Sequence, residues 1–302
     1  SRGLVGSDMC IRDRPTDYDG DGWTDLLLGG EWMPLVLLKN EEGTFKDVSE
    51  AMGIADTRAW WFGLGEGDFD GDGDMDYLAG NLGLNYKYKA SETETFDVYY
   101  DDFDASGTKD IVLSYYNYGE KFPVRGRECS SQQMPAIKKK FEDYASFSTA
   151  TLADVYTQQA LDESLHYQVK SFASVYLENT PEGFVIRELP VEAQISSIND
   201  FLVDDIDGDG NLDAVVAGNL YTSEVETPRN DASNGLFLKG DGNGGFQSVV
   251  ARKSGLYIPG DVKNLLHLNR KDGRYFLAGK NNDSLQVIRV NEVKKPDVMA
   301  LK

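Results

Sequence analysis

The sequence predicts an all-β protein of the β-propeller class, with about five recognisable blades in an incomplete ring and a two-helix insertion. Two repeated patterns predict this fold: a nine-residue acidic loop that occurs four times, and a glycine-turn hairpin that occurs three times. The composition of 31 glycines and 11% aromatic residues agrees with it, because tight turns need glycine and strands favour aromatic residues.

The acidic loop has the pattern D-x-[DS]-x-[DS]-G-x-x-D, and each copy runs directly into an apolar segment typical of a strand. We number the copies loop 1 (residues 17–25), loop 2 (68–76), loop 3 (102–110) and loop 4 (205–213). Their first residues lie 51, 34 and 103 positions apart, which indicates a unit of about 50 residues with one shortened copy and one large insertion. This period suits a propeller blade.

The second pattern is a hairpin in which alternating apolar residues flank a glycine turn and a phenylalanine follows the turn. Its copies are residues 36–45, 175–184 and 236–246. Gly43, Gly183 and Gly244 can take the positive φ that such a turn requires. An acidic loop, a strand and a hairpin together make one blade-sized unit.

The insertion at residues 130–167 has helical spacing, and two amphipathic helices are predicted in it. Apolar residues recur at helical intervals in two groups, namely Met134, Ile137, Phe141 and Tyr144, then Leu152, Val155 and Tyr156. We expect this stripe to pack against the propeller, and the alternative is a surface that binds a partner.

The propeller is predicted to span residues 15–294, between a foreign or truncated leader (1–14) and a tail (295–302). The leader lacks both the apolar core of a secretory signal and the periodicity of the rest. Residues 275–283 repeat the strand that follows the acidic loops, but Arg274 stands where the last carboxylate would be, so this fifth blade is expected to be metal-free. Because rings usually close with about six to eight blades, we expect the chain to be incomplete at its N-terminus.

The acidic loops contain the groups that Ca²⁺ prefers, since this hard ion takes about six to eight oxygen ligands from carboxylates, carbonyls and water. Loop positions 1, 3, 5 and 9 would supply side chains, position 7 its carbonyl, and the glycine at position 6 would permit the sharp turn. The expected ligands are Asp17, Asp19, Asp21, Trp23 and Asp25; Asp68, Asp70, Asp72, Asp74 and Asp76; Asp102, Asp104, Ser106, Thr108 and Asp110; and Asp205, Asp207, Asp209, Asn211 and Asp213.

Crowded carboxylates repel each other when no cation is present, and a divalent ion removes that cost. We therefore predict up to four bound Ca²⁺ ions, with ordinary acidic turns as the alternative. Loop 3 should be the weakest site because Ser106 replaces the middle carboxylate. A structural role for the ions is favoured, since the loops recur with the repeat instead of gathering at one place.

The charge balance limits the possible partners. An excess of 51 acidic over 30 basic residues gives a net charge of −21, which opposes binding to nucleic acid and to anionic lipid surfaces and makes cations the expected partners. Apolar runs stay short of the ~18 residues that span a bilayer, so no transmembrane segment is predicted. Cys10 lies in the leader and Cys129 stands alone in the body, so no disulfide framework is predicted.

The pairing of these loops with hairpins that end in G-x-F, and Trp61-Phe62-Gly63 ahead of loop 2, resembles the FG-GAP/VCBS repeats of integrin-α-like propellers over most of residues 15–291. Within that group the chain is most similar to bacterial repeat proteins that often carry an ASPIC/UnbV module, which is not visible in this sequence. The resemblance implies a propeller that binds calcium at the aspartates named above, in an exported or surface-associated protein. The helical insertion departs from the integrins.

Together these patterns predict an extracytoplasmic, calcium-binding β-propeller that acts as a non-catalytic binding or scaffold module for a protein or a polysaccharide. Extracellular calcium modules bind at about 10⁻⁴–10⁻³ M, which favours an extracellular, cell-surface or periplasmic location. The familiar hydrolase, nucleotide and zinc motifs are absent from the sequence, and His166 and His267 are expected to be structural.

Two other functions stay open at this point. One is a calcium-assisted lyase or hydrolase on acidic polysaccharides, in which Arg125, Arg127 and Glu128 would bind an anionic group. A solvated loop is the simpler interpretation of that charge cluster. The other is adhesion to a protein through the tyrosines of residues 115–118, which could equally serve sheet packing.

Overall fold

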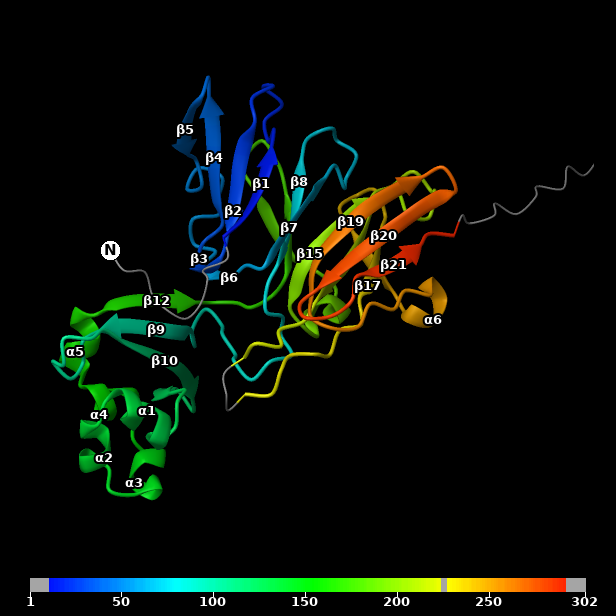
Figure 1. Cartoon of the computed structure of the whole chain (residues 1–302). Coiled ribbons are helices and arrows are strands. Elements are labelled where there is room, and N and C mark those ends of the chain that lie inside the picture. The colour runs from blue at the N-terminus through cyan, green and yellow to red at the C-terminus, as the bar shows by residue number, and fades with distance from the viewer. Residues whose placement is uncertain (1–10, 224–226, 292–302) are drawn as a thin grey trace, which may run out of the picture. The chain divides into compact units, whose positions relative to one another are not determined.

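The computed structural model describes residues 11–223 and 227–291 (Figure 1). Most of the predicted leader and the whole predicted tail lie outside the described residues. Strands make up 40% of the chain and helices 13%, which confirms the all-β class. The described residues divide into two compact units, of which unit 1 comprises residues 11–56, 60–86, 173–223 and 227–291, and unit 2 comprises residues 57–59 and 87–172.

Unit 1 contains four antiparallel sheets. Sheet 1 is formed by β1 (Arg12–Thr16), β2 (Asp25–Gly29), β4 (Val36–Glu41) and β5 (Thr44–Asp47), and sheet 2 by β7 (Gly63–Gly67), β8 (Asp76–Gly80), β13 (Val175–Glu178) and β14 (Val185–Glu188). Sheet 3 is formed by β15 (Ile198–Asp204), β16 (Asp213–Gly218), β17 (Leu236–Gly240) and β18 (Phe246–Val249), and sheet 4 by β19 (Val262–Arg270), β20 (Gly273–Lys280) and β21 (Gln286–Arg289). The connections contain β3 (Glu31–Met33), β6 (Ala59–Trp60), the 3₁₀ helix η1 (Val191–Gln194) and α6 (Ala251–Ser254).

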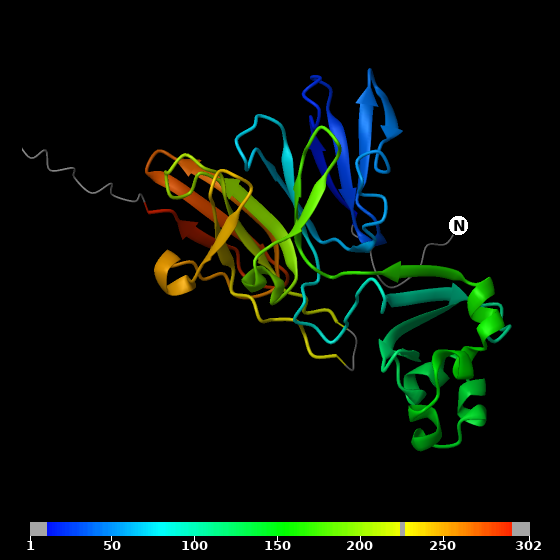
Figure 2. The same cartoon turned by 180° about the vertical axis from the view of Figure 1, so that it is seen from behind.

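The sheets of unit 1 stack with their first strands side by side, β1 against β7, β7 against β15 and β15 against β19 (Figure 1 and Figure 2). Phe69, Tyr176 and Leu238 belong to a core between sheets 2 and 3, and Val215 and Phe276 to a core between sheets 3 and 4. Strands β8 and β16 are therefore buried along their whole length. Within the described residues no closed barrel is found, which is consistent with the predicted incomplete ring.

The three predicted hairpins are confirmed, as β4–β5, β13–β14 and β17–β18. Their turn glycines all lie in the left-handed region, with φ of +94° at Gly43, +115° at Gly183 and +71° at Gly244. Because glycine has no Cβ, it adopts this conformation at no steric cost. Each hairpin supplies the third and fourth strands of a sheet.

Sheet 4 corresponds to the predicted fifth blade without an acidic loop. Its first two strands are joined by a tight turn in which Arg270 pairs with Gly273, so no loop of the acidic type is present there. Arg274, at the predicted place of the last loop carboxylate, is the second residue of the return strand after Gly273, whereas the strands that follow loops 1, 2 and 4 begin with the aspartate itself.

The first strand begins earlier than the predicted leader boundary at residue 14. Arg12 and Arg14 belong to β1 and pair with β2. Their guanidinium groups also donate to carbonyls in and directly before β7 of sheet 2, from Arg12 Nε to the Phe62 carbonyl at 2.8 Å and from Arg14 to the Leu64 carbonyl at 2.7 Å. Sequence patterning did not indicate this strand because its first residues are polar.

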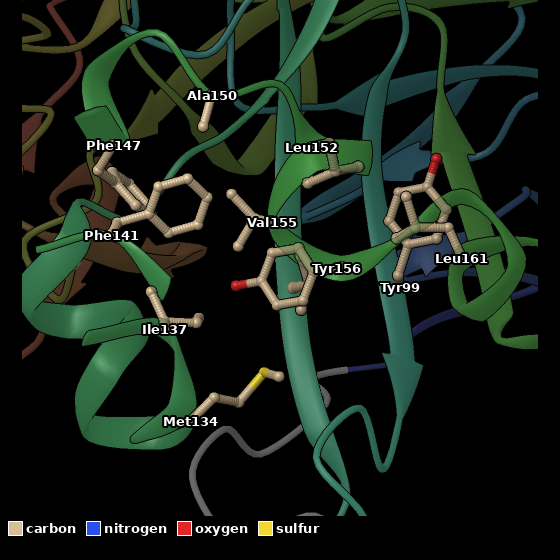
Figure 3. Packing of buried hydrophobic residues seen from close by; sticks show 11 residues of the cluster. Tyr99, Met134, Ile137, Phe141, Phe147, Ala150, Leu152, Val155, Tyr156 and Leu161 are labelled. Atoms are coloured by element: carbon tan, nitrogen blue, oxygen red, sulfur yellow. The ribbon is translucent and has the colours of Figure 1, made fainter. Parts of the chain in front are cut away.

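Unit 2 contains one four-stranded antiparallel sheet, in the order β11-β10-β9-β12, and five short helices. The strands are β9 (Phe96–Asp101), β10 (Asp110–Asn117), β11 (Glu120–Pro123) and β12 (Leu165–Val169), and the helices are α1 (Arg127–Gln133), α2 (Ala136–Lys140), α3 (Tyr144–Ser148), α4 (Leu152–Tyr156) and α5 (Gln158–Glu163). Tyr99 and Val112 from the sheet share one core with the helices. Figure 3 shows Tyr99 in this core together with helix residues such as Leu161 and Tyr156. No helix in the described part of the chain has the length and apolarity needed to cross a membrane.

The two amphipathic helices predicted at residues 130–167 are replaced by five helices of five to seven residues. Local breaks divide the segment: Pro135 follows α1, while Asp143 and Thr151 accept backbone N–H groups as N-caps of α3 and α4. Of the residues predicted to form the apolar stripe, Tyr144 is 64% exposed and the others are buried. The periodicity thus identified the core but not the helix boundaries.

Unit 2 is inserted within sheet 2 and not between two blades. Strand β8 pairs directly with β13, with Leu78 opposite Tyr176, although unit 2 separates them in the sequence. The insertion therefore covers residues 87–172 and includes loop 3, which corrects the prediction that loop 3 belongs to a shortened blade in series with the others. The repeat could not reveal this, because the strand after loop 3 has the same pattern as the strand after loop 2.

Candidate metal sites

Each acidic loop connects two consecutive strands that pair with each other in one sheet. Loop 1 joins β1 to β2, loop 2 joins β7 to β8, loop 3 joins β9 to β10 and loop 4 joins β15 to β16. Loops 1, 2 and 4 have glycine with positive φ at positions 4 and 6. Loop 3 has Ala105 at position 4 with φ of +56°, a conformation that costs a residue with a Cβ about 1 kcal/mol. Loop 3 therefore keeps the positive φ at position 4 but adopts it with alanine in place of glycine, so it departs from the pattern at Ala105 as well as at Ser106.

The aspartate at position 9 anchors each loop to its sheet. Asp25, Asp76, Asp110 and Asp213 are all buried, and one oxygen of each accepts the N–H of loop position 2 at 3.0–3.1 Å. In loops 1, 2 and 4 the other oxygen accepts an N–H from a residue in the third strand or directly after it, at 2.7–3.0 Å. In loop 3, Gln133 Nε2 from α1 donates instead, at 3.0 Å. These carboxylates hold the loop in place by hydrogen bonds within the protein.

The loops concentrate negative charge around the buried carboxylate of position 9. Burial raises the pKa of Asp25, Asp76 and Asp213, neighbouring loop carboxylates add to the rise, and the N–H donors act in the opposite direction. In loop 2, burial together with the charges of Asp72 and Asp76 raises the pKa of Asp74 to about 6. A cation placed among these groups would favour their ionised forms.

Positions 1, 3 and 9 converge in all four loops. Each residue offers one carboxylate oxygen, and the three oxygens of a loop lie within 4.8 Å of one another. The groups are Asp17, Asp19 and Asp25; Asp68, Asp70 and Asp76; Asp102, Asp104 and Asp110; and Asp205, Asp207 and Asp213. We call each group a carboxylate triad. The structure thus brings together the side chains predicted at these three positions.

Position 5 is not part of the triads. The carboxylates of Asp21, Asp72 and Asp209 each accept the N–H of position 7 at 2.9–3.0 Å, and the Ser106 hydroxyl accepts it at 3.3 Å. These bonds close the turn before position 7. Metal coordination by position 5 and by the carbonyls of position 7 stays a prediction, and the latter residues are Trp23, Asp74, Thr108 and Asn211.

Lysines from the third strands contact two of the loops. Lys39 pairs with Asp19 and Asp21 of loop 1, and Lys239 pairs with Asp207 and Asp209 of loop 4. A backbone hydrogen bond and Lys39 lower the pKa of Asp21. In the described residues no lysine or arginine pairs with a carboxylate of loop 2.

Each loop of unit 1 is also bonded to the next sheet through the carbonyl of position 2. Tyr18 O accepts from Asn179 Nδ2 at 2.8 Å, and Phe69 O accepts from the N–H of Gly244 at 3.1 Å. Ile206 O accepts from the Arg274 guanidinium at 3.1 Å. We call these three contacts the loop clasps. They link the backbone beside the triad to the packing of neighbouring sheets.

The triads fit a hard divalent cation such as Ca²⁺. Their donors are all oxygens, they carry a formal charge of up to −3 in a small space, and loop carbonyls lie nearby in sequence. The position 9 aspartate is oriented by hydrogen bonds, as supporting contacts do for metal ligands. This chemistry would not suit a metal that prefers sulfur or nitrogen ligands.

The two histidines lie in ordinary structural surroundings. His166 Nε2 lies 2.9 Å from the buried Asp97 Oδ1, and its ring stacks on Tyr99 with centroids 4.1 Å apart. His267 Nε2 lies 3.2 Å from the Val203 carbonyl. Both contacts agree with the predicted structural roles.

The charge cluster at residues 125–128 does not form an open anion site around Arg127. That guanidinium is buried and donates to the backbone carbonyls of Phe141, at 2.7 Å, and Glu142, at 2.9 Å. Arg127 therefore ties the helices together. Arg125 donates to Gln133 at 3.0 Å.

Sequence reasoning missed the residues that support the loops from outside. Lys39 and Lys239 occupy the same place in two copies of the hairpin, VLLKN and LFLKG, so the repeat contained a signal for them. The two side chains that donate in the loop clasps, Asn179 and Arg274, are of different residue types, so the repeat contained no signal for them. Because one clasp is made by a backbone N–H, no side-chain pattern could identify all three.

Comparison with known proteins supports the repeat assignment for part of the chain. A family model for the FG-GAP-like repeat matches residues 17–79, which include loops 1 and 2. No curated protein matches the chain at a significant level. The resemblance outside residues 17–79, and the similarity to ASPIC/UnbV-associated proteins, stay predictions.

Proposed function

We propose that the protein is an extracytoplasmic, calcium-binding module of the β-propeller type, and that it binds a protein or a polysaccharide without catalysing a reaction. The observation that carries this proposal is the recurrence of one carboxylate triad, in the loop between two neighbouring antiparallel strands, in four different sheets. A triad made by chance would not repeat with its anchoring hydrogen bonds.

The contacts around each loop support a structural role for the cation. The position 9 aspartate orients the loop, and the clasps connect that loop to the next sheet. A cation held by the triad would relieve carboxylate repulsion at this joint, and at 100 times the dissociation constant each site would add about 2.7 kcal/mol of stability. Four Ca²⁺ ions would change the net charge from −21 to −13, so the module would stay acidic.

Calcium titration by calorimetry, combined with thermal melts in calcium and in chelator, tests the proposal. We expect heat of binding and a higher melting temperature in calcium, and weaker effects in Asp70→Ala and Asp207→Ala. Asp231→Ala is the matched control, because Asp231 is exposed and lies outside the loops. No heat of binding and no change in melting temperature would reject calcium binding.

Incubation with a panel of pectins and other polyuronates, with and without chelator, separates the binding module from the lyase or hydrolase. The binding module predicts retention on a ligand without product. New ultraviolet absorbance from an unsaturated product would show a lyase, and new reducing ends without that absorbance would show a hydrolase.

A further inference from the structure

The same strand position holds different residues beside the three loops of unit 1. Lys39, Lys239 and Glu178 each follow a leucine that pairs with the strand leaving the loop, and the pairs are Leu38 with Leu26, Leu238 with Ala214, and Leu177 with Tyr77. We call this place the gate position. It holds lysine in sheets 1 and 3 and glutamate in sheet 2.

The two lysines at the gate position place an ammonium among the loop carboxylates. Lys39 Nζ contacts Asp19 and lies 3.1 Å from Asp21 Oδ2. Lys239 Nζ contacts Asp207 and lies 2.7 Å from Asp209 Oδ2. In both loops the contacted residues are positions 3 and 5, so the ammonium binds a carboxylate of the triad that the proposed cation would also use.

The glutamate at the gate position leaves loop 2 without such a cation. Glu178 pairs with Arg187 on β14, and its carboxylate adds to the negative charge of the surroundings. In the described residues the carboxylates of loop 2 form no ion pair, although the loop contains five aspartates. Loop 2 therefore has the highest uncompensated charge among the three.

We infer that the gate residue ranks the loops of unit 1 in their affinity for divalent cations, with loop 2 the tightest site and loops 1 and 4 weakened by Lys39 and Lys239. The inference rests on the proposed calcium binding. A cation entering loop 1 or loop 4 must either displace the ammonium or tolerate its positive charge a few ångströms away, and at that distance the repulsion is substantial. Loop 2 imposes neither cost.

The gate residue also determines how much each loop depends on the cation for its order. In loops 1 and 4 the ammonium already relieves part of the carboxylate repulsion, so those loops stay ordered in chelator. In the described residues no ammonium or guanidinium group reduces the repulsion among the carboxylates of loop 2. Its sheet is the one that unit 2 interrupts, so we expect calcium to order the sheet to which unit 2 is attached.

Terbium luminescence tests the effect at loop 1. Trp23 lies in this loop and is 46% exposed, so it can transfer energy to Tb³⁺ bound there. We expect Lys39→Met to tighten Tb³⁺ binding, followed through Trp23, by about tenfold. Lys46→Met is the matched control, since Lys46 lies directly opposite Lys39 on the adjacent strand β5 but pairs with Glu41 at 3.7 Å and, in the described residues, with no carboxylate of loop 1.

Calcium calorimetry tests the effect at loop 2. Glu178→Lys should weaken the tightest class of Ca²⁺ sites by about tenfold, and Glu178→Gln should weaken it less. Glu188→Lys is the control, because it makes the same charge change on β14 of the same sheet at an exposed position. The Lys39→Met result stands independently should Glu178→Lys fail to fold.

The outcomes separate this inference from the proposed function. Tighter binding in Lys39→Met and weaker binding in Glu178→Gln, with both controls unchanged, support the ranking. Normal calcium binding that none of the gate variants alters overturns the ranking and leaves calcium binding intact. No calcium or terbium binding in any variant, wild type included, overturns both.

Discussion

At the scale of single residues, the position 9 aspartate has two roles that the sequence motif does not distinguish. Asp76 accepts hydrogen bonds from the N–H groups of Phe69 and Asn179 and from Tyr176 Oη at 2.8 Å, and it also belongs to the triad. The motif predicted it as a ligand only. Its anchoring role depends on partners about 100 residues away in the sequence, which no local pattern can show.

We expect Asp76→Asn to destabilise the protein even in excess chelator. The amide keeps the shape of the side chain but directs an NH₂ group at a donor, so we expect a loss of about 1–3 kcal/mol in the free energy of unfolding. Asp72→Asn, at the more exposed position 5, should change stability in chelator little and reduce only the effect of calcium. Equal stability losses for the two variants in urea titrations would contradict the anchoring role.

The network around Asp97 predicts a pH effect in unit 2. Burial alone would raise the pKa of Asp97, but the hydrogen bond from His166 and the charge of Lys121 outweigh it and hold the pKa below its usual value. The ionised carboxylate therefore stabilises the fold above the unfolded pKa of about 3.9, and this stabilisation is lost as the pH falls through the lower pKa of the folded state.

We therefore expect wild type to be more stable than Asp97→Asn near pH 6, and the difference to shrink as the pH is lowered towards 2. Urea unfolding of both proteins at a series of pH values measures this difference directly. A difference that stays constant, or grows in acid, would show that ionised Asp97 does not contribute as described.

At the scale of elements, the hairpins and the acidic loops were predictable, and their connections to other elements were not. Turn glycines and alternating apolar residues fix a hairpin locally, as at Gly43 and Gly183. The pairing of β8 with β13 spans the whole of unit 2, and no local signal marks it. The short helices of unit 2 also depend on local caps such as Asp143 that interrupt an otherwise helical periodicity.

The loop clasp between sheets 3 and 4 can be tested at Arg274. This residue donates to Ile206 O, to Asp205 O at 2.9 Å and to Asp204 at 3.1 Å. Because the side chain is 38% exposed, we expect Arg274→Met to cost about 1 kcal/mol and to speed amide exchange in loop 4.

Arg270→Met is the control for Arg274→Met, since Arg270 is 60% exposed and its ion pair in the described part of the chain is with Asp272 at 3.4 Å. Hydrogen exchange measured by mass spectrometry would compare loops 2 and 4 in both variants. Equal exchange in loop 4 of the two variants would mean that the clasp does not hold the loop.

At the scale of the whole molecule, the sequence predicted the all-β class and the stacked sheets but not the division into two units. Loop 3 repeats the acidic motif, so spacing alone placed it in series with the other blades. The structure instead gives unit 2 a core of its own, in which Phe141 and Phe147 pack edge to face with ring centroids 5.4 Å apart. Stability should therefore be distributed unequally along the chain.

We expect Phe141→Ala to destabilise unit 2 by about 3–5 kcal/mol, the usual cost of removing a buried aromatic ring. Amide exchange should accelerate in residues 87–172 well before it does in unit 1. Phe45→Ala, at a phenylalanine that is 48% exposed in sheet 1, is the control and should have little effect. Uniform acceleration along the chain would show that the two cores unfold together.

The central claim is that the carboxylate triads bind divalent cations, and a crystal structure from millimolar calcium tests it most directly. We expect anomalous density in loop 2 first, with oxygens of Asp68, Asp70 and Asp76 at about 2.3–2.6 Å from the ion. Triads that remain free of metal in every loop at that calcium concentration, with their carboxylates turned to solvent, would contradict the claim.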